Sequence, residues 1–132
     1  KKQYLLALGA DQRPVAPDNA YWLNFLNKPA GFVKGPEKYA RGQGIPVVMM
    51  TTTRKKRGHY HFDYFLLCED PKSLPEGELI RQYVRHLEKN IQLQPDLYLW
   101  SHKRWKHPWK EEYEKMWVDD VASPSSKESF VR

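Results

Sequence analysis

The 132 residues fit one domain, and a hydrophobic fraction of 40% with 14% aromatic residues excludes intrinsic disorder. The net charge of +6 favours polyanionic partners such as anionic lipid or nucleic acid, although it also fits a basic face exposed to solvent. The single cysteine, Cys68, excludes an internal disulfide and zinc sites built on paired cysteines, and no apolar run approaches the roughly 20 residues that span a bilayer.

The chain enters an apolar run almost at once. Residues 4–8 are typical of a buried strand, and a sequence that reaches a strand so early is expected to belong to a longer protein. Residues 21–26 predict a second strand, and residues 27–31 predict a turn because they contain Asn, Pro and Gly.

The middle of the chain predicts a helix followed by a hairpin. The helix starts at Gly35 or Pro36, since proline fits the first turn of a helix. Residues 46–53 are rich in apolar and β-branched side chains and predict a strand. A basic turn over residues 54–58 separates it from a return strand over residues 59–67.

The strongest helix prediction covers residues 76–94, where apolar side chains recur at the helical period and Pro95 follows. Residues 111–118 predict one or two helical turns. We expect the domain to end at residue 118, with a flexible tail over residues 119–132.

The order β-β-α-β-β-α predicts an α/β fold with a single mixed sheet and helices on its face. Ligands in such sheets collect at the carboxyl ends of strands. Asp11, Gln12 and Arg13 follow the first predicted strand, so they are candidates for binding or orienting a polar substrate. The alternative is a loop whose side chains cap its own backbone.

Other candidate sites are weaker. His59 and His61 point to the same face of a strand, but no third metal ligand has a suitable spacing, so we interpret them as exposed hairpin residues. His107 and Glu112 have the spacing of a base and its orienting acid, which we interpret as coincidence. Glycine patterns that bind phosphates are absent from the sequence, and we expect no metal or cofactor.

Residues 97–106 alternate large rings with Lys and Arg. Such a segment suits a membrane interface, where rings and basic groups meet headgroups. It also suits stacking on single-stranded bases, or a terminal element that buries Trp100 and Trp105 in the core.

The segment over residues 95–106 resembles the C-terminal signature of the bacterial lipid A biosynthesis acyltransferases, also called late or secondary acyltransferases. Four further points follow in the family's order, and the resemblance covers about residues 3 to 110. They are Asp11-Gln12, the strand at residues 21–26 followed by Asn27, Lys34-Gly35-Pro36, and residues 44–48 with the downstream Arg54.

This resemblance implies transfer of a fatty acyl chain from acyl carrier protein to a hydroxyl of a lipid A precursor, at the cytoplasmic face of the bacterial inner membrane. It implies the C-terminal portion of a glycerolphosphate-acyltransferase-like fold, with an N-terminal membrane anchor and a catalytic His-x4-Asp/Glu motif upstream of residue 1. Lys34 replaces the family's usual Thr, and Asn27 stands where Gly is common, which leaves the acceptor and the acyl length open.

The resemblance also assigns roles to residues of this chain. Asp11 is expected to support catalysis. Gln12, Arg13, Lys34, Gly35 and Arg54 are expected to bind substrate. Six residues are expected to contact the anionic membrane surface or to pack in the core: Trp100, His102, Lys103, Arg104, Trp105 and Lys106. Nucleic acid is not an expected partner under this interpretation. The alternative is a module without catalysis whose basic aromatic segment binds nucleic acid or anionic lipid.

Overall fold

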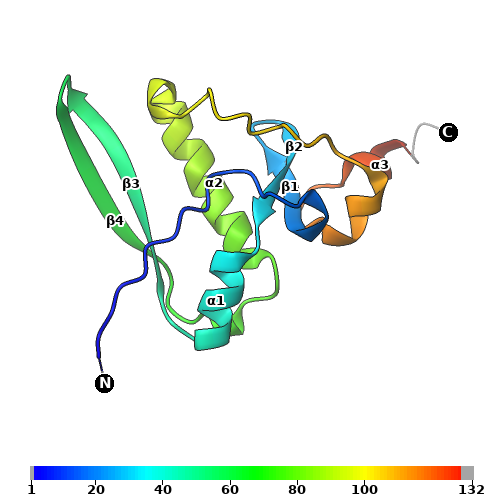
Figure 1. Ribbon diagram of the computed structural model, residues 1–132, viewed down its shortest axis with the longest axis horizontal. Coiled ribbons are helices and arrows are strands. Elements are labelled where there is room, and N and C mark those ends of the chain that lie inside the picture. The colour runs from blue at the N-terminus through cyan, green and yellow to red at the C-terminus, as the bar shows by residue number, and fades with distance from the viewer. Residues whose placement is uncertain (1, 129–132) are drawn as a thin grey trace.

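The long helix α2 (Glu78–Leu93) lies at the centre of the computed structural model, which describes residues 2–128 (Figure 1). The other regular elements are β1 (Ala20–Phe25), β2 (Lys28–Val33), α1 (Gly35–Gln43), β3 (Val47–Lys56), β4 (His59–Cys68) and α3 (Pro124–Glu128). Short 3-10 turns occur at Pro17–Asn19, Pro71–Ser73, Pro95–Leu97 and Glu111–Met116. The α/β class, α1, α2 and the hairpin of β3 and β4 are therefore confirmed. Within the described residues, no helix is long and apolar enough to cross a membrane.

The strands form two separate antiparallel hairpins, so the expected single mixed sheet is wrong. β1 pairs with β2, and β3 pairs with β4. Each strand finds its partner across a short turn, and such local pairing costs little chain entropy. Between residues 2 and 128, the one further bridge joins Trp22 to Trp117 in parallel.

The strand β2 occupies most of the segment that was expected to be a turn. The actual turn is Leu26-Asn27, where both residues have positive φ, as hairpin turns of two residues require. Pro29 is tolerated because β2 is an edge strand. Gly31 is favoured by close packing, since a Cβ there would approach Pro14 and Trp22 to 3.3 Å. Proline and glycine thus mark an edge and a close contact here.

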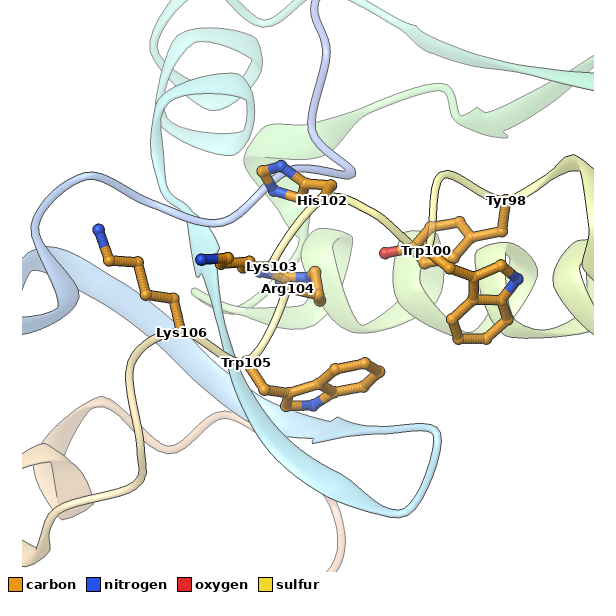
Figure 2. A pocket seen from close by; sticks show the side chains of 7 residues that line it. All are labelled: Tyr98, Trp100, His102, Lys103, Arg104, Trp105 and Lys106. Atoms are coloured by element: carbon orange, nitrogen blue, oxygen red, sulfur yellow. The ribbon is translucent and has the colours of Figure 1, made fainter.

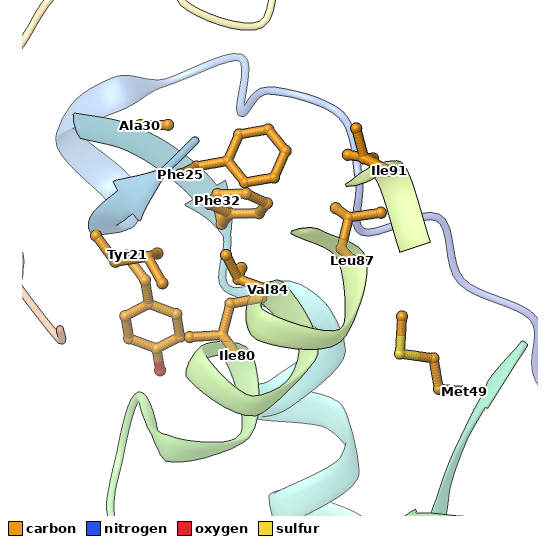
Figure 3. Packing of buried hydrophobic residues seen from close by; sticks show 10 residues of the cluster. Tyr21, Phe25, Ala30, Phe32, Met49, Ile80, Val84, Leu87 and Ile91 are labelled. Atoms are coloured by element: carbon orange, nitrogen blue, oxygen red, sulfur yellow. The ribbon is translucent and has the colours of Figure 1, made fainter. Parts of the chain in front are cut away.

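The main core lies between α2 and the hairpin of β1 and β2 (Figure 3). The predicted apolar stripe of α2 supplies Ile80, Val84, Leu87 and Ile91. These side chains pack against Phe25 and Phe32, and Met49 of β3 reaches the same cluster. The helix N-terminus is capped from α1, because the buried Glu37 carboxylate accepts hydrogen bonds from the backbone N–H groups of Gly77 and Ile80.

A second core covers the opposite face of β1. Trp22 stacks on Tyr113 with ring centroids 4.7 Å apart, and Trp109 meets the edge of both rings. The backbone N–H of Val118 donates to the carbonyl of Trp22. The hairpin of β1 and β2 is therefore covered on both faces, which explains why four consecutive residues of β1 are buried.

The expected strand at residues 4–8 does not form. The segment is extended but unpaired, and Leu5 is 92% exposed. Its side-chain contact to the body is the hydrogen bond between the hydroxyls of Tyr4 and Tyr39 of α1. An apolar run becomes a strand only where another strand offers its edge, and no strand in the described part of the chain pairs with this one.

Part of the expected tail is packed against the domain. Asp119 accepts hydrogen bonds from the backbone N–H of Asn24 and from Arg85, and Ser123 is buried and donates to Glu114. The expectation of a flexible tail also covers residues 129–132, which lie outside the described residues.

Candidate functional site

The loop that carries Asp11 is joined to the basic aromatic segment near the other end of the chain. The backbone N–H of Arg13 donates to Nε2 of His102 at 3.2 Å. Ala10 and Pro14 are buried on either side of Asp11 and anchor the loop. The fold thus brings together two groups of expected site residues that lie 89 positions apart.

Arg104 forms the buried centre of this junction, with an exposed fraction of 3%. Its guanidinium lies 3.9 Å from the ring centroid of Phe32, and its Nη2 donates to the carbonyl of Gly31. Burial lowers the pKa of Arg104 to about 10, while Tyr98 and Asp11 act in the opposite direction. The guanidinium therefore carries its charge at neutral pH.

Two tyrosines, Tyr83 and Tyr98, complete the surroundings of Arg104, although neither is among the site residues expected from the sequence. Burial raises the pKa of Tyr83 and of Tyr98, and the negative charge of Asp11 contributes in the same direction to both. Asp11, Arg104 and the two phenols therefore form one electrostatic cluster. Tyr83 fits the apolar stripe of α2, so its spacing in the sequence indicates a core position and not a site.

A cavity of about 360 Å³ opens beside this cluster, a size typical of ligand pockets. Its lining residues are Tyr98, Trp100, His102, Lys103, Arg104, Trp105 and Lys106 (Figure 2). Four polar groups of the residues that line the cavity are buried without a hydrogen-bond partner among the described residues: Nε and Nη1 of Arg104, the hydroxyl of Tyr98 and Nε1 of Trp105.

The side chains of the basic aromatic segment, residues 97–106, divide between surface and core. Lys103 and Lys106 are exposed and extend to the opposite side of the segment from the ring of Trp105 (Figure 2). Trp105 stacks on Phe25 of the main core. Trp100 is 52% exposed, and its Nε1 donates to the carbonyl of Pro95. Arg104 and Trp105 thus serve the interior, whereas Trp100 and the lysines face solvent.

Lys34 and Gly35 lie at a different place, at the start of α1. The ammonium of Lys34 lies 5.1 Å from the ring centroid of Tyr21, and both residues line a second cavity of about 530 Å³. There the Tyr21 hydroxyl donates to Glu76 at 2.9 Å, and burial followed by this hydrogen bond raises the pKa of Tyr21. A Cβ on Gly35 would meet no atom within 4 Å, so packing does not require glycine there.

Arg54 holds the β3 and β4 hairpin against the C-terminal end of α2. Its backbone N–H donates to Gln94, and its side chain pairs with Asp96. The expected substrate-binding residues therefore occupy three separate places. Gln12 is exposed beside Asp11.

No group of three possible metal ligands occurs within residues 2–128. His61 is hydrogen-bonded to Asp63 of its own strand, with 2.9 Å between Nε2 and Oδ1. His59 and His61 therefore lie on an exposed hairpin, and no third metal ligand joins them among the described residues.

Comparison with known proteins gives one family. The model of the bacterial lipid A biosynthesis acyltransferases matches residues 1–107, which include every expected site residue. No curated protein and no solved structure gives a significant match to the chain.

Proposed function

Because the chain belongs to the bacterial lipid A biosynthesis acyltransferase family, we propose that it is part of an enzyme that moves a fatty acyl chain from acyl carrier protein to a hydroxyl of a lipid A precursor. The observation that carries the proposal is the family match over the residues that bring Asp11 and Arg104 together. The alternative of a binding module without catalysis gains no support from the family match.

The catalytic base is proposed to be the His of a His-x4-Asp/Glu motif upstream of residue 1. It would take the proton of the acceptor hydroxyl while the oxygen attacks the thioester carbonyl; the C–S bond then breaks, and the leaving carrier thiolate takes the proton back from the imidazolium. His102 is a poor substitute, because its Nε2 already accepts the Arg13 backbone hydrogen bond. Asp11 would act beside the base: its negative charge would balance the positive charge of Arg104, and its carboxylate would orient the acceptor.

The intact protein is proposed to have a glycerolphosphate-acyltransferase-like fold. Residues 4–8 would then be a strand of a larger sheet. The exposed apolar side chains of this extended segment support that placement, because Leu5, Leu6 and Leu8 are all more than 45% exposed.

The 132-residue chain alone is expected to show no acyl transfer above the uncatalysed rate. Joined to a family segment that carries the His-x4-Asp/Glu motif, it is expected to transfer labelled acyl chains from acyl carrier protein to the lipid A precursor. The measurement is product formation with both proteins, and thermal unfolding verifies that the isolated chain is folded. Turnover by the isolated chain would show that the base is misplaced.

The surface best suited to an anionic membrane is the hairpin of β3 and β4, which projects from the body in Figure 1. One face of the hairpin carries six apolar side chains that are 50% to 66% exposed: Val48, Met50, Tyr60, Phe62, Tyr64 and Leu66. Arg54, Lys55, Lys56 and Arg57 lie at its tip. Adjacent apolar and basic groups match the acyl boundary and the phosphates of an anionic bilayer.

Reversing two tip charges, Lys55→Glu with Lys56→Glu, is expected to weaken binding to phosphatidylglycerol vesicles by at least about tenfold at low salt. The matched control is Lys103→Glu with Lys106→Glu, for which we expect a change below about threefold because that segment has no comparable apolar face. Cosedimentation measures both. If both variants lose vesicle binding equally, residues 97–106 also contact the membrane. If the hairpin variant loses no binding, another part of the polypeptide covers the apolar face of the hairpin.

A further inference from the structure

Arg104 is a charged side chain that is buried with two of its three nitrogens unpaired. Nη2 is bonded to Gly31, whereas Nε and Nη1 have no acceptor in the described part of the chain. Leaving such donors unpaired is costly, and the cost is greater for a charged group. Cation–π contact with Phe32 offsets some of the cost but supplies no acceptor for these nitrogens.

The hydroxyl of Tyr98, which lines the same cavity, is also buried without a hydrogen-bond partner in the described part of the chain. In Figure 2 the ring of Tyr98 directs its oxygen toward the side on which Arg104 lies. The wall of the cavity therefore contains, just beneath its surface, a positive guanidinium and a phenol that can donate, together with the unpaired indole N–H of Trp105. A ligand that satisfies both must be negative and must carry several acceptor oxygens.

Asp11 does not fill this role. Its charge affects the pKa of Arg104, yet neither free nitrogen of Arg104 has a hydrogen bond to it. The exposed lysines, Lys103 and Lys106, add positive potential around the opening, which attracts an anion and repels a cation.

We propose that Arg104 and Tyr98 bind the phosphate group of a substrate in this cavity. The site itself is argued from the unpaired donors, while the source of the phosphate rests on the proposed function. Two substrates of that reaction carry one: the phosphorylated glycolipid acceptor, and the phosphopantetheine arm of the acyl donor.

Titration of the 132-residue chain with inorganic phosphate tests the site without acyl transfer. The NMR signal of the Arg104 Nε–H is expected to shift and saturate. Tyr98→Phe is expected to weaken binding about fivefold, which corresponds to the loss of one hydrogen bond. Arg104→Lys keeps the charge but loses the fork of donors, and we expect a loss of at least about tenfold.

The matched controls are Tyr39→Phe and Arg41→Lys on α1, which do not line the cavity, and both should leave phosphate binding unchanged. If Arg104→Lys does not fold, as judged by circular dichroism, Tyr98→Phe decides. The proposal fails if the Arg104 signal stays fixed, or if only Lys103 and Lys106 respond.

Two further arms identify the source. Competition by soluble phosphopantetheine assigns the site to the donor, and competition by vesicles that contain phosphatidic acid assigns it to the lipid acceptor. The two proposals can fail separately. If the full-length protein transfers no acyl group but the chain still binds phosphate, the proposed reaction is refuted and the phosphate site is retained.

Discussion

Replacing Asp11 with alanine is expected to lower kcat/KM of the intact acyltransferase by at least about 100-fold, whereas His107→Ala should change it by less than about threefold. Asp11 supplies the negative charge that acts on Arg104, Tyr83 and Tyr98. Without it, the buried guanidinium loses a counter-charge beside the proposed reaction. Steady-state rates with acyl carrier protein as donor give the measurement.

The conservative variant Asp11→Asn separates charge from shape. If charge carries the role, Asn should lose nearly as much activity as Ala, although both retain the loop. The Asp11 side chain is half-buried and makes no hydrogen bond to another described residue, so both variants should stay folded and show the same small loss in thermal unfolding from the missing counter-charge. Equal damage from Asp11→Ala and His107→Ala would overturn the ranking of these two sites.

The elements that the sequence predicted well are those stabilised by near neighbours. The apolar stripe of α2 and the Pro36 start of α1 depend on spacing within a few residues, and both helices form as expected. The hairpin of β3 and β4 joins strands that are separated by a short basic turn. Local patterns of this kind need no knowledge of distant contacts.

The errors come from contacts between distant parts of the chain. Whether residues 4–8 become a strand depends on an available edge, which their own sequence does not reveal. Gly31 was interpreted as part of a turn, although it is fixed by the approach of Pro14 and Trp22 and by its carbonyl bond to Arg104. A charged residue between rings suggests a surface, and only the fold shows that Arg104 lies over Phe32.

The candidate site was predicted in part. The sequence selected Asp11, Arg13, His102 and Arg104, and the structure places them around one junction. It did not separate Lys34 and Arg54 from that group, because similarity along the chain does not give distances between its motifs. Tyr83 was missed because a ring in the apolar stripe of α2 fits the core equally well, and Tyr98 because the segment over residues 97–106 was expected to act through its tryptophans and basic residues.

Asp119→Ala is expected to lower the free energy of unfolding by about 2–3 kcal/mol, which is a large effect for a residue in the segment expected to be flexible. The Asp119 side chain is fully buried. Its carboxylate accepts the Asn24 backbone N–H at 2.8 Å and pairs with Arg85 at 2.6 Å, so the substitution leaves donors from β1 and α2 without their acceptor. Urea unfolding measures the loss. Glu112→Ala is the matched control, because Glu112 and its ion-pair partner Lys110 are both exposed, and its change should stay within about 0.5 kcal/mol.

The contribution of Asp119 should also depend on pH. Burial by itself raises the pKa of Asp119, but hydrogen bonds from Asp120 and Arg85 outweigh it and hold the pKa below its ordinary value of 3.8. The stabilisation is therefore complete well above pH 3.8 and is lost as the pH falls through the lower pKa of the folded state. The difference between the unmodified chain and Asp119→Ala should be constant near neutral pH and shrink in acid. A difference that persists unchanged into strong acid would show that Asp119 stabilises the fold by packing, and not through the charge that ties residue 119 to α2.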